Sequence, residues 1–175
     1  VQTNGVPAFI RDVLVPMNRQ EGDSLPVSAF LPQADGTYPL GTSAYEKRGI
    51  AINVPEWQPE NCIQCNQCSF VCPHASIRPI LVNDAEKAAA PEGFAVKDAV
   101  GAKDLYFRLA ISTQDCTGCG NCAEICPAKV KALQMKPLAS QEAQVTLWDY
   151  AVSLTPKKNP ANPFTVKGSQ FEQPL

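Results

Sequence analysis

The sequence predicts an α+β fold, in which short strands and helices build a small core from an internal repeat. Three observations predict it. The eight cysteines fall into two copies of one pattern. Short stretches rich in β-branched and aromatic residues follow or precede those copies, as strands would. Proline accounts for 16 of the 175 residues, and because proline fixes φ and removes an amide donor, we expect extended, proline-rich arms at both ends.

The two cysteine runs both read C-x-x-C-x-x-C-x-x-x-C-P, and the second begins at Cys116, 54 residues after Cys62. The first run comprises Cys62, Cys65, Cys68 and Cys72, followed by Pro73; the second comprises Cys116, Cys119, Cys122 and Cys126, followed by Pro127. This pattern resembles the signature of the bacterial ferredoxins, which hold two [4Fe-4S] clusters. The resemblance implies a bacterial 2[4Fe-4S] ferredoxin-like core and an electron-transfer role.

The same resemblance implies how the ligands are shared, because the fourth cysteine of each run ligates the other cluster in two-cluster ferredoxins. We expect one cluster on Cys62, Cys65, Cys68 and Cys126, and the other on Cys116, Cys119, Cys122 and Cys72. We also expect each fourth cysteine to lie on a short helix. Gly118 and Gly120 flank Cys119 and would let the backbone approach a cluster and donate amide hydrogen bonds to sulfur.

Two other interpretations of eight cysteines stay open at this point. Structural zinc sites would use two C-x-x-C pairs each, which leaves the central cysteines of these runs without a role. Four disulfides would imply an oxidising compartment. The complete runs with both prolines favour iron–sulfur clusters over either alternative.

The remaining elements are expected in chain order as follows. A helix interrupted near Pro16 is expected over 6–20, followed by a mostly irregular stretch over 21–48. Strands are expected over 77–82, 105–112 and 132–138, and residues 83–101 read as a surface insertion. The expected domains are an irregular N-terminal extension (1–54), the two-cluster domain (55–140, with the insertion 83–101) and a C-terminal linker arm (141–175).

Composition limits the remaining function classes. The formal net charge of −2 gives no reason to expect nucleic-acid binding, and no apolar run has the length of a membrane span. His74 stands next to a ligand cysteine, where it would tune a cluster or simply face solvent. Lys129, Lys131 and Lys136 would form a positive rim for an acidic electron acceptor or an ordinary solvated face.

Several segments outside the cysteine runs resemble the pyruvate:ferredoxin (flavodoxin) oxidoreductases. They are VPAFIRDVLVPM (6–17), GDSLPVSAF (22–30), GTSAYEKRGI (41–50), WQPEN (57–61) with the following CIQCNQCSFVCPHASIRP (62–79), and KGSQFEQPL (167–175). The cysteine runs are shared with all two-cluster ferredoxins, so these flanking segments make the resemblance specific. It spans essentially the whole chain.

This resemblance implies that the chain is the inserted two-cluster domain of a large cytoplasmic enzyme, which decarboxylates pyruvate on thiamine diphosphate and makes acetyl-coenzyme A. Thiamine diphosphate, Mg²⁺ and a third [4Fe-4S] cluster would lie in the rest of the parent enzyme, expected to be a homodimer. Electrons would leave to ferredoxin or flavodoxin. The chain begins at Val1 rather than Met, so we expect a fragment without pyruvate activity of its own; the alternative is a free-standing two-cluster electron carrier.

Overall fold

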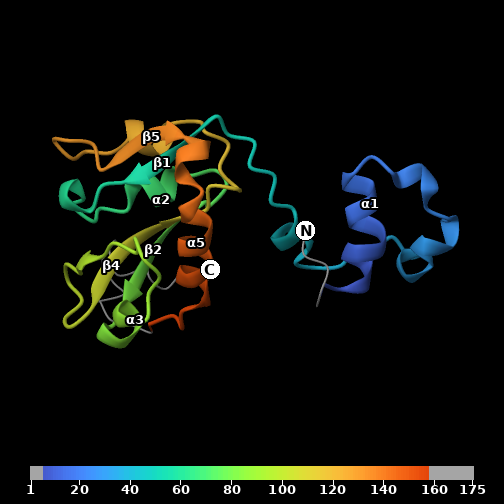
Figure 1. Cartoon of the computed structure of the whole chain (residues 1–175), viewed down its shortest axis with the longest axis horizontal. Coiled ribbons are helices and arrows are strands. Elements are labelled where there is room, and N and C mark those ends of the chain that lie inside the picture. The colour runs from blue at the N-terminus through green and yellow to red at the C-terminus, as the bar shows by residue number, and fades with distance from the viewer. Residues whose placement is uncertain (1–5, 158–175) are drawn as a thin grey trace. The chain divides into compact units, whose positions relative to one another are not determined.

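The computed structural model describes residues 6–157 and divides the chain into two compact units, 1–47 and 48–175. Figure 1 shows the helices and strands of both units. Each unit is described by itself below. The closing segment KGSQFEQPL and most of the predicted proline-rich C-terminal arm lie outside the described residues.

Over its described residues, 6–47, the first unit is built from one helical segment and short 3₁₀ segments. A π-helical turn, Ile10–Leu14, runs directly into α1, Val15–Asn18, and buries Ile10, Val13 and Leu14. The helix predicted over 6–20 therefore changes type before Pro16 instead of stopping there. A π turn suits this place because proline has no amide to donate to the preceding turn.

The rest of this unit is irregular, as predicted for 21–48. It contains only 3₁₀ turns, at Gly22–Ser24, Val27–Gln33 and Thr42–Tyr45. The Phe9 ring meets the Tyr38 ring edge-to-face with 5.1 Å between their centroids, which joins the helix to the later turns.

The second unit contains two small antiparallel sheets. One pairs β1, Asn53–Trp57, with β5, Leu133–Pro137; the other has the order β2-β4-β3, with β2 at Ile77–Val82, β4 at Tyr106–Ile111 and β3 at Lys97–Asp98. The structure confirms the strands predicted over 77–82, 105–112 and 132–138. Strand β1 was not predicted, because its sequence NVPEW contains a proline and a glutamate, residues depleted in strands.

Strand β4 is buried along almost its whole length and separates two hydrophobic cores. The first core lies around Trp57 and Phe107, whose rings meet edge-to-face with centroids 6.0 Å apart. Its other buried members include cysteines from both runs: Cys62, Cys68, Ile77, Leu81, Ala102, Leu109, Ile111, Cys122, Ala132 and Leu133. Because cysteines of both runs belong to this core, the sheets fix the positions of both cysteine loops.

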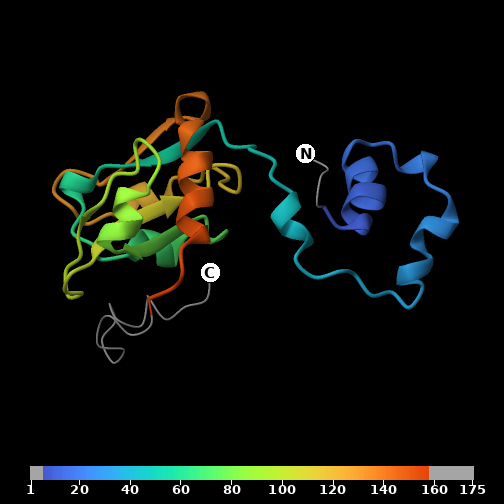
Figure 2. The same cartoon turned by 60° about the horizontal axis from the view of Figure 1, so that its bottom comes forward.

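The second core lies under helix α5, Ala143–Ser153, which flanks the sheets in Figure 2. Leu147 and Ala151, one helical turn apart, pack there with Ile80, Val82, Phe94 and Ala110. This helix falls within 141–175, the range predicted as a C-terminal linker arm. Only these two helix residues are fully buried, which leaves too weak a 3.6-residue pattern to predict the helix.

The predicted insertion 83–101 has structure of its own. It opens with α3, Asp84–Ala88, which carries a capping box: Glu86 N donates to Asn83 Oδ1 and Asn83 N donates to Glu86 Oε2, both at 2.9 Å. Phe94 is buried, and Arg108 Nη1 donates to Ala95 O at 2.7 Å. Burial lowers the pKa of Arg108 to about 10. The segment therefore adds to the core as well as to the surface.

No helix among residues 6–157 has the length and apolar character needed to cross a membrane.

The position of Phe107 yields the first prediction. Its side chain is fully buried between the two sheets, so Phe107→Ala should lower the free energy of unfolding by about 3–5 kcal/mol, measured by urea denaturation of the chain. Phe70→Ala is the matched control, because the same atoms are removed from a side chain that is 58% exposed. Equal losses in the two variants would contradict the described core.

Candidate metal centre

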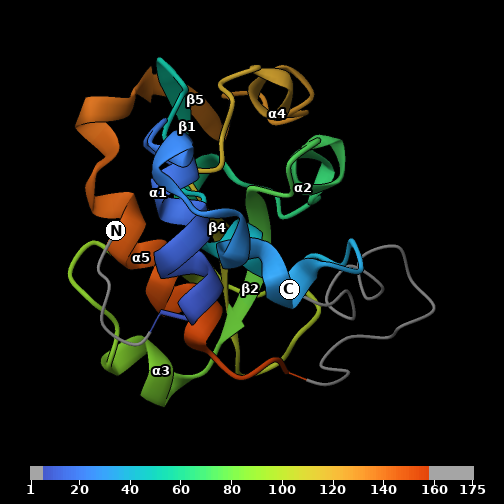
Figure 3. The same cartoon turned by 90° about the vertical axis from the view of Figure 1, so that its right-hand side faces the viewer.

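Each cysteine run folds as a loop that leads into a short helix. Cys68 lies in α2, Gln67–Val71, and Cys122 lies in α4, Asn121–Glu124. The two helices lie side by side (Figure 3). The repeat in the sequence is thus also a repeat in the structure.

The fourth cysteines do not lie on these helices, which corrects the prediction. Cys72 caps the C-terminus of α2 with extended backbone (φ −71°, ψ 112°), and Cys126 follows the capping residue Ile125 of α4. The physical reason is the proline after each of them, because a residue before proline is pushed out of the helical region. It is the third cysteine of each run that the helix holds.

Left-handed backbone recurs at equivalent places in the two loops. Gln64 and Gly118 have φ of 58° and 73°, and Asn66 and Gly120 have φ of 59° and 79°. In this conformation Gln64 N donates to Cys62 Sγ at 3.4 Å, and Gly118 N donates to Cys116 Sγ at 3.3 Å. Such a loop turns amides toward a negative group. The amide hydrogen bond to sulfur expected near Cys119 is therefore present at Gly118.

The fourth cysteines also accept backbone amides. Ser76 N donates to Cys72 Sγ at 3.3 Å, and Ala132 N donates to Cys126 Sγ at 3.4 Å. In each run, the sulfur atoms of the first and fourth cysteines thus accept a hydrogen bond from the main chain. These bonds stabilise a thiolate more than a thiol, because they are donated to the charged form.

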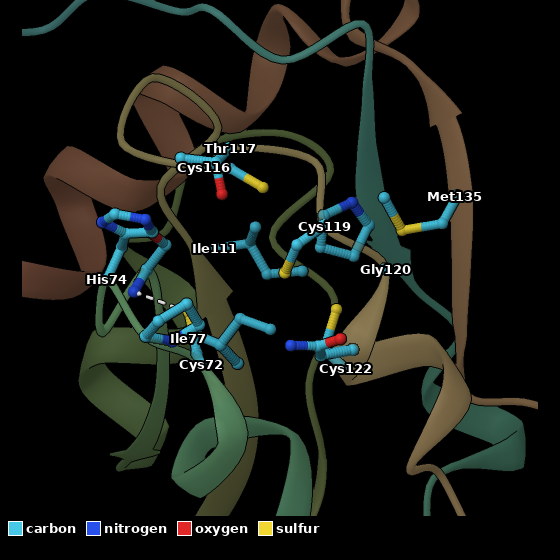
Figure 4. A pocket seen from close by; sticks show the side chains of 14 residues that line it. Cys72, His74, Ile77, Ile111, Cys116, Thr117, Cys119, Gly120, Cys122 and Met135 are labelled. Carbon is cyan, nitrogen blue, oxygen red and sulfur yellow. Dashed lines mark hydrogen bonds between the residues drawn. The ribbon is translucent and has the colours of Figure 1, made fainter.

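A pocket gathers one cysteine of the first run with three of the second. Figure 4 shows its wall, which is lined by Cys72, Cys116, Cys119 and Cys122 together with the apolar side chains of Pro55, Ile77, Ile111 and Met135. His74 lies at the wall of the same pocket and is exposed to solvent. The structure therefore brings together the four cysteines predicted to share the second cluster.

Three of the other four cysteines belong to the first core or pack against it. Cys62 and Cys68 are buried, Cys65 is half-buried, and Cys126 packs against the core cluster that contains Cys62 and Cys68. Burial, followed by the charges of Cys62 and Cys65, raises the pKa of the Cys68 thiol to about 12; Cys122 contributes as well. Cys62 and Cys65 therefore lie close enough to Cys68 to influence its ionisation.

Two thiols of the second group, Cys116 and Cys122, have pKa values shifted in the same direction. Burial is the first cause that raises the pKa of Cys122 to about 11, with Cys116, Cys72 and Cys119 adding to it. Burial also raises the pKa of Cys116, where the amide of Gly118 acts in the opposite direction. Buried thiols of this kind ionise when a metal supplies positive charge.

The donor set fits iron–sulfur clusters: sulfur ligands, an apolar wall and main-chain amides aimed at sulfur. All eight cysteines are free thiols, so the disulfide interpretation gains no support. Within residues 6–157, no three His, Cys, Asp or Glu side chains converge as they would on a single metal ion.

Two residues that sequence analysis did not single out bind the first loop. Lys97 Nζ donates to Cys62 O at 2.8 Å and to Pro59 O at 3.0 Å. Gln64 Nε2 donates to Asp98 O at 2.7 Å, and its Oε1 accepts from Val100 N at 2.9 Å. Lys97 stands 35 positions after Cys62 in sequence, and no local signal marks it. The predicted insertion thus holds the first cysteine loop.

Comparison with known proteins finds two matching families and several similar proteins. Residues 58–130 match a family described as "4Fe-4S dicluster domain", and residues 1–51 match the family EKR, described as a domain of unknown function. The chain is 65% identical over 175 residues to a pyruvate-flavodoxin oxidoreductase of Enterobacter agglomerans, covering 100% of this chain and 15% of that protein.

Two further relatives extend the comparison. A pyruvate:ferredoxin oxidoreductase of Moorella thermoacetica is 59% identical over 172 residues, which cover 97% of this chain and 14% of that protein. A pyruvate dehydrogenase [NADP(+)] of Cryptosporidium parvum is 48% identical over 174 residues, which cover 97% of this chain and 9% of that protein. The chain therefore spans about one seventh of the length of the first relatives it matches.

The close approach at Gly118 yields the second prediction. A Cβ at this position would lie 2.7 Å from Asn53 O and 3.2 Å from Ala51 Cβ, and φ is +73°. Gly118→Ala should therefore lower the free energy of unfolding, measured by urea denaturation, by about 1–3 kcal/mol or more, since strained backbone alone costs that amount.

Gly120→Asn is the matched control. Its φ is +79° with open space around a Cβ, and the equivalent place in the first loop already holds Asn66 at φ 59°. Asn tolerates this conformation, so the control should change stability little. A control as damaging as Gly118→Ala would show that the contact with Asn53 is not the cause.

Proposed function

Because the chain matches, over its whole length, a segment of the pyruvate:ferredoxin (flavodoxin) oxidoreductases and carries a 4Fe-4S dicluster domain, we propose that it is the electron-transfer domain of such an enzyme. In this role it relays single electrons from the site of pyruvate oxidation to ferredoxin or flavodoxin. The observation that carries the proposal is the pocket that joins Cys72 to Cys116, Cys119 and Cys122.

The proposed ligand sets are crossed between the two runs. One cluster would be held by Cys62, Cys65, Cys68 and Cys126, and the other by Cys116, Cys119, Cys122 and Cys72. The second set is supported by the shared pocket. The first is supported by the packing of Cys126 against the core that contains Cys62 and Cys68, a core to which Cys122 of the second set also belongs.

The chain's own residues hold, shield and tune these sites. When bound, a [4Fe-4S] cluster accepts and gives up one electron at a time. The amides of Gln64, Ser76, Gly118 and Ala132 favour negative charge at sulfur. The apolar wall formed by Ile77, Ile111 and Met135 limits water around the second site. Both effects would change the reduction potential of a bound cluster, and neither makes or breaks a covalent bond.

The carbon chemistry of the parent enzyme would lie outside this chain. We propose that thiamine diphosphate, Mg²⁺ and a third [4Fe-4S] cluster are bound by the remaining parts of a cytoplasmic, homodimeric parent, and that the chain alone lacks activity on pyruvate. The free-standing carrier is not favoured, because the whole chain matches one segment of much longer proteins.

The crossed ligand sets yield the third prediction. Cys126→Ala should damage the cluster of the first run and leave the other cluster assembled, because its sulfur would be lost from the Cys62 group. Cys72→Ala is the matched variant and should do the reverse. The measurement is EPR of the reduced chain after anaerobic reconstitution with iron and sulfide, with iron and acid-labile sulfide assayed in parallel.

The unaltered chain should show two interacting four-iron signals and bleach with dithionite. Damage by Cys126→Ala that is confined to the signal of the Cys116 group would contradict the crossed assignment. Colourless protein that takes up zinc but neither iron nor sulfide would contradict the proposed function itself.

A further inference from the structure

Lysine charge is concentrated on the ligands of one of the two proposed clusters. Lys97, from strand β3, places its half-buried ammonium on three main-chain carbonyls of the first cysteine loop. These are Pro59 O at 3.0 Å, Glu60 O at 3.4 Å and Cys62 O at 2.8 Å. All three bonds are to neutral carbonyls, so no carboxylate in them cancels the positive charge.

Lys131 makes the corresponding contact on the second cysteine run. Its ammonium donates to Glu124 O at 2.6 Å and to Cys126 O at 2.9 Å. Cys126 belongs to the second run in sequence, but to the Cys62 group in the proposed crossed arrangement. Both lysines therefore lie on main-chain carbonyls of ligands to the same cluster, although they come from different parts of the chain.

The other ligand group has a different surrounding charge. The wall of its pocket contains neither lysine nor arginine, and His74 is the basic residue in it. Arg78 Nε donates at 3.0 Å to the carbonyl oxygen of Ala75, three residues after Cys72, so one arginine contacts the loop of this group, whereas both Lys97 and Lys131 contact carbonyls of ligands in the other group. Asp115 directly precedes Cys116 and accepts a 2.5 Å hydrogen bond from Ser112 Oγ. Carboxylates also flank the first group at Glu60 and Glu124, but both residues are exposed to solvent, where water and salt screen their charges.

We propose that Lys97 and Lys131 give the cluster of Cys62, Cys65, Cys68 and Cys126 the higher reduction potential of the pair. Adding an electron makes a cluster more negative, and a fixed positive charge nearby stabilises that product. One electron then leaves the Cys116 group, which is oxidised, and enters the Cys62 group, which is reduced; no bond forms or breaks. This inference rests on the proposed function and adds to it the direction of electron transfer between the two clusters.

The two lysines are positioning residues in this scheme, and their contributions should differ. Lys97 is half-buried and fixed by three acceptors, whereas Lys131 is exposed. Solvent screens the charge of an exposed side chain more strongly. Removing Lys97 should therefore have the larger effect on the potential.

The test is an EPR-monitored redox titration of the full 175-residue chain, reconstituted anaerobically, with Lys97→Met or Lys131→Met. The signals are first assigned to the two ligand groups with Cys126→Ala and Cys72→Ala. Lys97→Met should reduce the ratio of reduced to oxidised cluster in the Cys62 group about tenfold at a fixed solution potential, which corresponds to a shift of about −59 mV for one electron. Lys131→Met should shift the same signal in the same direction by less, and the Cys116 group should move little.

Two further variants keep the test decisive. Lys103→Met removes an equal charge at an exposed position of the turn before β4, and it should move neither signal. If Lys97→Met fails to assemble, Lys131→Glu carries the test, since its exposed side chain tolerates replacement; it should shift the Cys62-group signal further than Lys131→Met does.

Equal shifts of both signals, no shift beyond that of Lys103→Met, or a shift confined to the Cys116 group would each overturn the inference. All three outcomes require two assembled clusters, so they leave the proposed function intact. Failure of the unaltered chain to take up iron and sulfide would instead remove the proposed function, and the two failures are therefore distinguishable.

Discussion

The proposed sharing of cysteines between the two halves of the repeat is the constraint on which the proposed site depends. Cys72 ends the first helix and yet lines a pocket with three cysteines of the second run. Pro73 and Pro127 impose this arrangement locally, because they force the preceding cysteine out of the helix. In the proposed arrangement neither run supplies all four sulfurs of a cluster, so the two halves would have to pack together before either cluster could be held.

The two loops reach the same backbone geometry by different means. In the second loop, glycines occupy the left-handed positions, and Gly118 lies so close to Asn53 O that no Cβ fits. In the first loop, Gln64 adopts the same conformation with its side chain fully buried and bonded to Asp98 and Val100. Those contacts offset the strain of a non-glycine residue at positive φ. The two cysteine loops thus share a backbone conformation but have different neighbouring residues. These neighbours can give the two proposed clusters different reduction potentials.

Sequence patterns predicted the parts of the fold that depend on local chemistry. The strands at Ile77–Val82, Tyr106–Ile111 and Leu133–Pro137 carry β-branched or apolar residues beside the cysteine runs, and each was predicted within two residues. The parts that depend on long-range packing could not be predicted. Strand β1 is fixed by its pairing with β5 in spite of Pro55, and α5 is fixed by the second core.

In the candidate site, too, the features set by local sequence could be predicted and those set by long-range contacts could not. The eight cysteines and the role of Gly118 follow from residue type and spacing, whereas the placement of the fourth cysteines on helices was wrong because the effect of the following prolines was not applied. The contact of Lys97 with Cys62 is visible only in three dimensions.

The most direct measurement of the central claim is anomalous X-ray diffraction at the iron absorption edge from anaerobically grown crystals of the reconstituted chain. The account predicts two iron peaks, each surrounded by three cysteine sulfurs of one run and one of the other; four sulfurs of a single run around one peak would contradict it.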